Sequence, residues 1–151
     1  LLNLKKEIEA STNEMHEVSI EYFTPRGKWY HHSWKGDVKK SGGIATNIGI
    51  HLFDLVCWLF GDVKEVSTEI NTATQCTGNL QLEKATVSWK LSIEPSVASK
   101  RQITINGKTI EFTDGFADLH TTSYQHILNN KGFTIHDVKP SVDIVERIRN
   151  F

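Results

Sequence analysis

The sequence predicts an α+β domain in which an open, mostly antiparallel β-sheet carries helices on one face. Three observations support this prediction. Helical spacing opens and closes the chain, alternating strand patterns follow one another between residues 63 and 112, and one long apolar helix precedes them. Hairpin-linked strands beside segregated helices are typical of this class. A chain of 151 residues with 38% hydrophobic residues is expected to form a single domain with a proper core.

The first third of the chain predicts a helix, a strand and a loop. Residues 2–10 have the spacing of a helix, and residues 17–24 alternate as a strand does. Pro25-Arg26-Gly27 is typical of a turn. Residues 28–37 have no clear period, so we expect an ordered loop there. Its Trp, Tyr, His and Lys side chains would also suit stacking on, and charge contact with, a sugar or nucleotide.

The second half predicts the strands of the sheet. Residues 63–74 are rich in Val, Ile and Thr, and residues 80–93 form a strand with one packed face and one hydroxyl-rich face. In residues 101–112, Asn106-Gly107 lies between alternating runs, which is the strongest short signal for a hairpin. A polar face of short side chains is either solvated or meets a partner subunit; here it carries Thr86, Ser88 and Ser92.

Two helices are predicted at the end of the chain. Residues 118–130 return to helical spacing, and Gly132 ends that helix. We expect Pro140 in the first turn of the last helix, where a proline is tolerated. The apolar positions of this helix are Val142, Ile144, Val145 and Ile148.

A long central helix is predicted from Ser41 to Gly61. Ser41 can cap its start, and Gly61 suits a left-handed residue just past its end. Apolar residues also occupy much of the remaining surface, so we expect the helix to be buried on most sides. Its main apolar positions recur at three- and four-residue steps: Ile44, Ile48, Leu52, Leu55 and Leu59.

One narrow polar stripe interrupts this apolar helix. At about 100° per residue, Asn47, His51, Asp54 and Trp58 fall within about 60° of one another. Burying such groups unpaired costs about 1–3 kcal/mol each, so a neighbouring element or a ligand must satisfy them. Two interpretations follow: a core helix whose histidine is satisfied by the protein, or a pocket wall with His51 as acid or base. Gly42-Gly43 before the stripe would let an anionic ligand approach the free N–H groups of the helix.

Composition excludes several classes of function. A net charge of −1 gives no sign of nucleic-acid or acidic-membrane binding. The longest apolar run, residues 48–60, contains His51 and Asp54, so we expect neither a transmembrane helix nor a signal peptide. Cys57 and Cys76 form no disulfide framework, which suits a reducing cytoplasm.

The chain has neither a GxGxxG nor a GxxxxGK[ST] motif, so we expect no cofactor-binding residues in it. Because it opens at Leu1 in a helical pattern, we expect a preceding part.

The stretch SWKGDVKKSGGIATNIGIHLFDLVCWLFGDV, residues 33–63, resembles the signature of the Gfo/Idh/MocA oxidoreductase family. That signature has Gly-Gly, then Asp-x-x-x-His, then Asp, Trp and Gly. The end of the chain, LHTTSYQHILNNKGFTIHDVKPSVDIVERIRN, resembles the family's last two helices. The resemblance implies that residues 1–151 are the C-terminal domain, with a dihydrodipicolinate reductase-like fold. An N-terminal Rossmann domain, which would bind most of the NAD, would then precede Leu1.

Within the family, TPRGKWY, SWKGD and KSGGIATNIGIH are similar to bacterial UDP-N-acetyl-glucosaminuronate 3-dehydrogenases. Those enzymes oxidise the sugar 3-hydroxyl with NAD on the way to diaminouronic acids of surface polysaccharide. The resemblance therefore implies a nucleotide-sugar substrate and a cytoplasmic enzyme. It also implies a homodimer or tetramer that pairs through the open face of the sheet.

The resemblance assigns roles to individual residues. His51 matches the family's active-site histidine, and Asn47 stands where many members have Asp, so an amide would orient the histidine but could not stabilise an imidazolium. Asp54 matches a structural Asp, while the family's catalytic lysine would lie outside this chain. The residues expected to bind substrate are Arg26, Trp34, Lys35, Gly42, Gly43, Thr46, Asn47 and His51.

Two other functions stay open at this point. His51 and Asp54, with His31 or His32, could ligate zinc, although adjacent histidines point apart in an extended chain. The domain could also be a non-catalytic sugar-binding or dimerisation module. In the dehydrogenase interpretation, the isolated chain is expected to be inactive.

Overall fold

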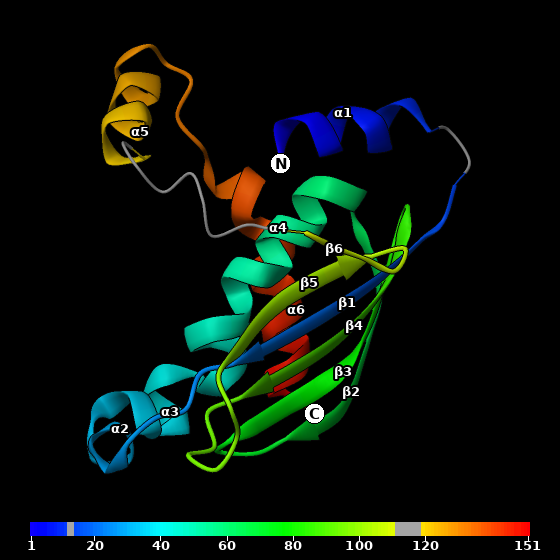
Figure 1. Cartoon of the computed structure of the whole chain (residues 1–151). Helices are drawn as coiled ribbons and strands as arrows, with labels where there is room; N and C mark the ends of the chain where they lie inside the picture. Colours follow the sequence, from blue (N-terminus) through cyan, green and yellow to red (C-terminus); the bar gives the residue numbers. More distant parts are fainter. Residues whose placement is uncertain (12–13, 111–118) are drawn as a thin grey trace.

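The computed structural model describes residues 1–11, 14–110 and 119–151. Six strands form one sheet: β1 (His16–Phe23), β2 (Val63–Asn71), β3 (Gln75–Leu82), β4 (Ala85–Ser92), β5 (Lys100–Ile105) and β6 (Lys108–Ile110). The helical segments are α1 (Leu2–Ala10), α2 (Lys28–His32), η1 (Trp34–Gly36), α3 (Val38–Ser41), η2 (Ala45–Gly49), α4 (Ile50–Phe60), α5 (Leu119–Leu128) and α6 (Ile135–Arg149). Figure 1 shows their arrangement.

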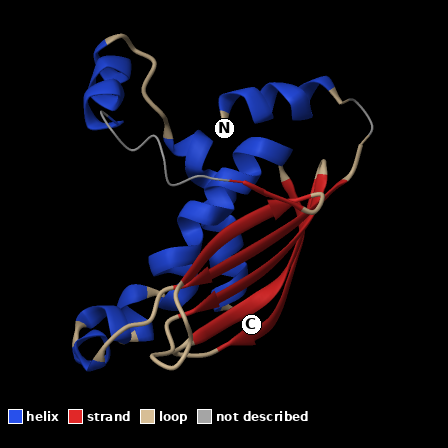
Figure 2. Ribbon diagram, viewed as in Figure 1, coloured by secondary structure: helices blue, strands red, loops and turns tan. Residues whose placement is uncertain are grey.

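The sheet has the strand order β2-β3-β4-β1-β5-β6. All neighbouring strands are antiparallel except β1 and β4, which run parallel, with His16 opposite Ala85. Helices α4 and α6 cover one face of the sheet, and the other face is open (Figure 2). The predicted α+β fold with an open, mostly antiparallel sheet is therefore confirmed.

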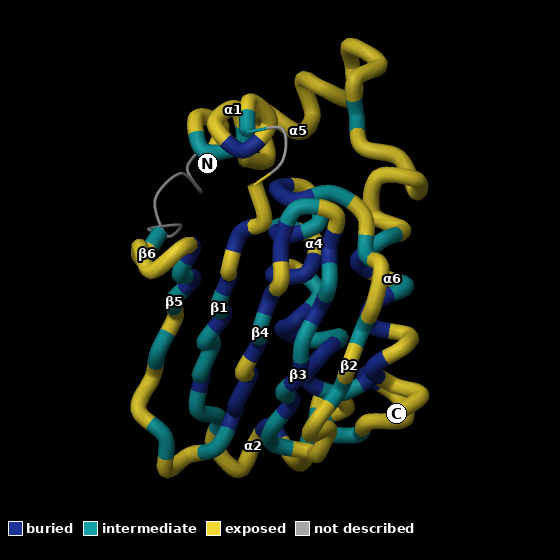
Figure 3. Tube along the Cα trace, turned by 90° about the vertical axis from the view of Figure 1, so that its right-hand side faces the viewer, coloured by how far each residue is buried: buried dark blue, intermediate teal, exposed yellow. Residues whose placement is uncertain are grey.

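The core lies between the sheet and these two helices. Along most of β4, buried and more exposed residues alternate (Figure 3). Trp89 on β4 packs edge-on against Phe53 of α4, with ring centroids 5.5 Å apart. From α6, Ile144 and Ile148 complete the same core without exposed surface. The packed face predicted for residues 85–93 is confirmed.

The prediction of one strand over residues 80–93 was wrong. The segment contains the end of β3, a tight turn at Glu83 and Lys84, and all of β4. The turn was missed because it contains no Gly, Pro, Asn or Asp to mark it. Antiparallel pairing places Leu80 opposite Val87, so both flanking runs send apolar side chains into the same core.

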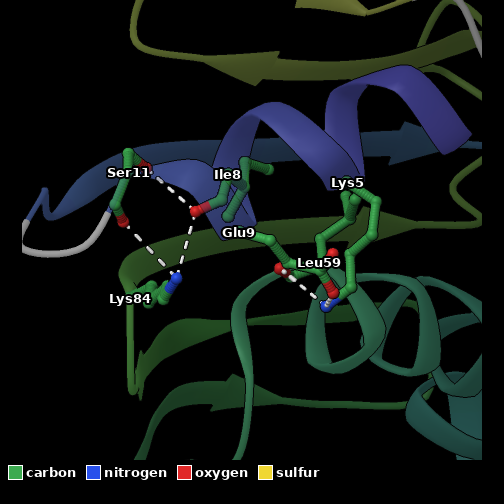
Figure 4. A network of polar contacts seen from close by, with 6 residues as sticks. All are labelled: Lys5, Ile8, Glu9, Ser11, Leu59 and Lys84. Carbon is green, nitrogen blue, oxygen red and sulfur yellow. Dashed lines mark hydrogen bonds and ion pairs between the residues drawn. The ribbon is translucent and has the colours of Figure 1, made fainter.

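Polar contacts hold α1 against the end of α4 and the turn between β3 and β4 (Figure 4). The Lys5 ammonium lies 3.5 Å from the Leu59 carbonyl and forms an ion pair with Glu9. Lys84 in the turn donates to the carbonyl of Ile8 at 3.0 Å. Because these carbonyls end their helices, the lysines satisfy acceptors that have no partner within the helix.

The predicted helix from Ser41 to Gly61 is interrupted near its start. The short helix α3 ends at Gly42, whose φ of 77° is left-handed, and Gly43 has a φ of 78°. The Ser41 hydroxyl accepts the N–H of Gly43 at 3.1 Å, but Ser41 is the last residue of α3 and the next helical segment begins without a side-chain cap. The prediction that Ser41 caps the central helix was therefore wrong. Gly61 has the expected positive φ of 86°, but its ψ of −165° lies outside the left-handed helical region.

The prediction that the polar stripe is buried was wrong. His51 and Asp54 are exposed, Trp58 is 39% exposed, and Asn47 is half-buried. Helix α4 packs one face on the sheet and also contacts α6, and these elements leave His51, Asp54 and Trp58 largely open to solvent. The burial cost expected for these groups therefore does not apply in this chain. Asp54 accepts a hydrogen bond from Ser141 of α6 at 3.2 Å.

Two further predictions were wrong in detail. Residues 28–37 are not a loop but the helical turns α2 and η1. Pro140 is not in a first turn, because α6 begins at Ile135 after a capping box formed by Thr134 and Asp137. A hydrogen bond from the Thr134 N–H is the largest cause that lowers the pKa of the Asp137 carboxyl.

The hairpin at Asn106-Gly107 is confirmed. Both residues have positive φ, 49° and 79°, as a tight hairpin turn requires. The helix predicted over residues 118–130 is confirmed as α5, Leu119–Leu128. It is followed by a turn in which Asn130, and not the predicted Gly132, has the positive φ of 56°. Residues 111–112 and 118, at the ends of these two predicted elements, lie outside the described residues.

One described segment, Val38–Phe60, is long and apolar enough by composition to cross a membrane. This is weak evidence, because the core helix of a globular domain has the same composition. Here the segment is broken at Gly42, and α4 packs its apolar face on the sheet.

Candidate functional site

A cavity of about 430 Å³ lies between the end of β1 and the first turns of the central helix. This volume is in the range of small-molecule sites in proteins. The cavity brings together three predicted site residues: Arg26, Asn47 and His51. Its remaining lining consists of Leu1, Tyr22, Ile48, Leu52 and Leu55.

Backbone hydrogen bonds to β4 position Arg26. After β1 ends, the N–H of Thr24 donates to the Ser92 carbonyl at 2.8 Å, and the N–H of Arg26 donates to the Ile93 carbonyl at 3.0 Å. The segment therefore continues alongside the end of β4 as an extended chain. The Arg26 side chain is half-buried, and its Nε is buried without a hydrogen-bond partner among the described residues.

Asn47 and His51 lie on either side of Gly49, where the central helix is in close contact with Leu91 of β4. Asn47 belongs to η2, a π-helical segment, and such segments are frequent at functional sites. A Cβ at Gly49 would lie 2.8 Å from the Phe53 ring and 2.9 Å from Leu91, so only glycine allows this approach. Asn47 and His51 flank Gly49 in the sequence but do not share its contact with Leu91, and both line the cavity at the end of β1.

The amide of Asn47 is oriented by two acceptors. Its Nδ2 lies 3.4 Å from the Lys35 carbonyl and 3.5 Å from the Tyr30 hydroxyl, both long contacts. Tyr30 is only 4% exposed, so its hydroxyl is a fixed reference point. This orientation leaves Oδ1 available to accept a hydrogen bond. Among the residues with described positions, no hydrogen bond joins Asn47 to His51.

An exposed aromatic and basic segment adjoins the cavity. Trp34 is 59% exposed, and the Lys35 ammonium lies 5.9 Å from its ring centroid. Lys39 and Lys40 of α3 are exposed nearby in the sequence. Neither Trp34 nor Lys35 lines the cavity, but the Lys35 carbonyl contacts Asn47 at its edge. The segment could bind a flat base and an anionic group.

Three predicted site residues have local structural explanations. The Thr46 hydroxyl donates to the Gly42 carbonyl at 2.9 Å. A Cβ at Gly42 would lie 2.3 Å from Thr46 Oγ1, and the positive φ of Gly42 and Gly43 also disfavours side chains. None of the three lines the cavity.

Sequence reasoning missed Tyr22 and the apolar wall of the cavity. Tyr22 follows Val18 and Ile20 at two-residue steps along β1, so it lies on the same face of the strand as these two buried residues. The signal in the sequence for a site at this point was the tyrosine itself. It ends an apolar row, and a tyrosine hydroxyl usually needs a polar neighbour. The Arg101 guanidinium lies 5.5 Å from the Tyr22 ring centroid.

A second hollow, of about 380 Å³, lies on the open face of the sheet. Thr86 and Ser88 line it, as the predicted polar face requires, together with Glu17, Ser19 and Asn79. Ser92, assigned by sequence to that face, is buried instead, and its hydroxyl accepts the N–H of Glu94. Ser92 is the last residue of β4, and the segments that follow β1 and β4 contact it there through Thr24 and Glu94.

The histidine–aspartate combination considered for zinc does not form a cluster. Across residues 1–11, 14–110 and 119–151, no three His, Cys, Asp or Glu side chains are close enough to hold a metal ion. Asp54 instead contacts Ser141.

Comparison with protein families defines the class of the chain. Residues 12–92 match the family described as "Oxidoreductase family, C-terminal alpha/beta domain", the Gfo/Idh/MocA oxidoreductases. The chain therefore belongs to this family, as its C-terminal domain, and the resemblance noted in the sequence is confirmed.

Solved structures of sugar dehydrogenases are similar over almost the whole chain. The WlbA (WbpB) dehydrogenase of Thermus thermophilus, in complex with NAD and α-ketoglutarate, is 40% identical with a TM-score of 0.90. The alignment covers 99% of this chain and 52% of that one. The same dehydrogenase in complex with NAD and UDP-GlcNAcA is 39% identical with a TM-score of 0.88. This alignment covers 99% of the present chain and 51% of the dehydrogenase.

A more distant relative shares the fold. The WlbA dehydrogenase of Bordetella pertussis, in complex with NADH and UDP-GlcNAcA, is 19% identical with a TM-score of 0.75, over 99% of this chain and 57% of that one. The present chain thus spans about half the length of the dehydrogenases it resembles.

Proposed function

We propose that this chain is the substrate-binding half of an NAD-dependent dehydrogenase that oxidises the 3-hydroxyl of a UDP-N-acetylated hexuronic acid. The observation that carries the proposal is the single cavity that gathers Arg26, Asn47 and His51. The similarity to WlbA, which was crystallised with NAD and UDP-GlcNAcA, supports this substrate class. A role in surface polysaccharide synthesis is part of the proposal.

NAD would be held mainly by a Rossmann domain that precedes this one in the intact polypeptide. The sequence offers no glycine-rich turn for a dinucleotide phosphate. Once bound, NAD supplies the acceptor for the hydride that leaves the sugar carbon. The residues of this chain would then shape the sugar site and exclude water from it.

His51 is proposed to remove the proton from the sugar hydroxyl. As the C–H bond loses hydride, the O–H bond loses its proton, and an imidazole nitrogen can accept this proton. Asn47 has its amide nitrogen directed at Lys35 and Tyr30, so its Oδ1 can accept a hydrogen bond from the substrate or from the imidazole. Trp34 and Lys35 are proposed to contact the nucleotide.

The test is His51→Asn in the intact polypeptide. Removing a general base is expected to lower turnover of UDP-GlcNAcA, followed as NADH formation, by about 10²–10⁴-fold. Because His51 is exposed, the melting temperature should not change. His126→Asn on α5, which is also exposed, is the matched control and should keep full turnover.

Other outcomes would change the assignment. A loss below about tenfold would mean that His51 only positions the sugar, and that the proton transfer belongs to another group. If the intact wild-type polypeptide produces no NADH from any UDP-sugar, the domain is a non-catalytic sugar-binding or dimerisation module instead.

The open sheet face is proposed to pair subunits into a dimer or tetramer, and the enzyme is proposed to work in the cytoplasm. The face carries short uncharged side chains such as Thr86 and Ser88 around the hollow described above. The free thiols Cys57 and Cys76 agree with a reducing compartment.

A further inference from the structure

We propose that Arg26 determines substrate specificity by binding the carboxylate of the hexuronic acid inside the cavity. This inference rests on the proposed function, and it assigns to Arg26 the discrimination between an acidic sugar and its neutral counterpart.

The first observation is that the Arg26 guanidinium lacks a protein partner. Its Nε is buried and unpaired, and no hydrogen bond or ion pair joins the guanidinium to the described part of the chain. Unlike the charged side chains that are exposed on the surface and solvated by water, this guanidinium is half-buried and has its Nε shielded from solvent. A partly desolvated cation without a counter-charge destabilises the fold, so its presence indicates a ligand that completes it.

The second observation is the character of the cavity. Arg26 carries the only permanent charge among the lining side chains with described positions. Ile48, Leu52 and Leu55 make the opposite lining apolar. A low-dielectric wall strengthens the attraction between a guanidinium and an anion, so an entering acidic group has one strong point of attachment.

The third step decides which acidic group of the substrate this is. A single planar guanidinium matches a carboxylate, which it binds with two parallel hydrogen bonds. The diphosphate carries more charge, and a more exposed basic segment outside the cavity suits it. This segment has Lys35, whose ammonium lies 5.9 Å from the Trp34 ring centroid, and the exposed Lys39 and Lys40 a few residues along the chain. The geometry therefore points to the sugar carboxylate in the cavity and the nucleotide along the exposed segment.

The fourth step concerns His51. Because His51 and Arg26 line one cavity, a carboxylate bound to Arg26 would fix the sugar ring relative to the imidazole. Arg26 would thus act on binding and on orientation, which converts carboxylate recognition into selection for the reaction.

The experiment uses Arg26→Met and Arg26→Lys in the intact polypeptide. The KM for UDP-GlcNAcA and the inhibition constant of neutral UDP-GlcNAc are measured beside the melting temperature. For Arg26→Met we expect the KM for the acid to rise roughly 30-fold or more, with little change in the inhibition constant of the neutral sugar. The melting temperature should stay the same or rise, because an unpaired buried N–H is removed.

Arg26→Lys keeps the charge but loses the planar fork, so its KM should fall between those of the wild type and Arg26→Met. Lys35→Met is the matched control on the nucleotide side. It should raise the KM for UDP-GlcNAcA and the inhibition constant of UDP-GlcNAc by the same factor. A lowered melting temperature for both Arg26 variants, with both sugars weakened equally, would show a structural role and overturn the inference.

The remaining outcomes separate the inference from the proposed function. If the wild type oxidises UDP-GlcNAcA but Lys35→Met alone loses the preference for the acid, then Lys35 and not Arg26 binds the carboxylate. If the wild type does not oxidise UDP-GlcNAcA, the proposed function fails, and the carboxylate assignment fails with it.

Discussion

Cys57 illustrates at the residue scale how the environment of a side chain sets its chemistry. Burial raises the pKa of its thiol to about 12, and the carboxylates of Asp54 and Asp62 act in the same direction. Burial also raises the pKa of Cys76. Both thiols are therefore protonated at neutral pH, which makes them poor nucleophiles.

Alkylation with iodoacetamide at pH 8 tests this prediction. Cys57 should react about three orders of magnitude more slowly than a free thiol, because its thiolate fraction is that much smaller. The chain unfolded in guanidinium chloride is the control and should react at the free rate. Fast labelling of Cys57 in the folded protein would contradict the burial.

The same pKa makes stability depend on pH at the alkaline end. The folded state holds the Cys57 proton more tightly than the unfolded state does, because its pKa is the higher one. This contribution is fully present below about pH 8.5, and it is lost as the pH rises to about 12. The melting temperature should therefore fall across this range more steeply in the wild type than in Cys57→Ala.

At the scale of elements, the contact between the central helix and β4 positions the site. Gly49 lets the helix approach Leu91, and Phe53 packs beside the same point. Asn47 and His51 flank Gly49 in the sequence. A change in the spacing between helix and sheet is therefore expected to move both side chains.

Gly49→Ala tests this dependence. The added methyl would meet Phe53 and Leu91, both buried, so we expect a loss of about 1–3 kcal/mol in the free energy of unfolding. This exceeds the roughly 1 kcal/mol that alanine gains over glycine in a helix. Denaturant titration gives the stability, and turnover of the intact polypeptide should fall in parallel.

The matched control is Gly27→Ala. Its backbone is extended, and the new Cβ would lie 3.3 Å from the exposed Trp29 side chain, which can move. We expect a change within about 0.5 kcal/mol. If Gly49→Ala were equally neutral, the close contact would not control the site.

At the scale of the whole molecule, the open sheet face is the surface expected to pair subunits. Light scattering should show a dimer or tetramer for the 151-residue chain. Ser88→Arg, which places a long charged side chain in the hollow on this face, should shift the population toward the monomer. Glu7→Arg on the exposed side of α1 is the control. A monomeric wild type at high concentration would contradict the prediction.

The division of labour between domains gives a second prediction at this scale. Residues 1–151 alone should neither bind NAD tightly nor oxidise a sugar, because the glycine-rich loop is absent from them. Isothermal calorimetry measures this directly. Micromolar NAD binding by the isolated chain would show that the cofactor site includes residues of this domain.

Much of the fold was predictable because its signals are local. The alternation in β1 and β4, the Asn106-Gly107 turn and the helical spacing of α4 each depend on neighbours in the sequence. The turn at Glu83 carried no such signal, and two strands were therefore read as one. The start of α6 was predicted too late because a proline is expected in the first turn of a helix, whereas Pro140 lies inside α6 and the capping box of Thr134 and Asp137 marks the true start.

By itself, the sequence determined the α+β class, the family and the candidates Asn47, His51 and Arg26, because periodicity and motif are properties of short stretches. Only the tertiary structure decided that β1 lies parallel to β4 and that the polar stripe is exposed. It also brought the end of β1 beside the central helix, so that Arg26 and His51 line one cavity. The physical reason is that exposure and juxtaposition depend on which elements pack together, and that choice minimises the free energy of the whole chain rather than of any segment.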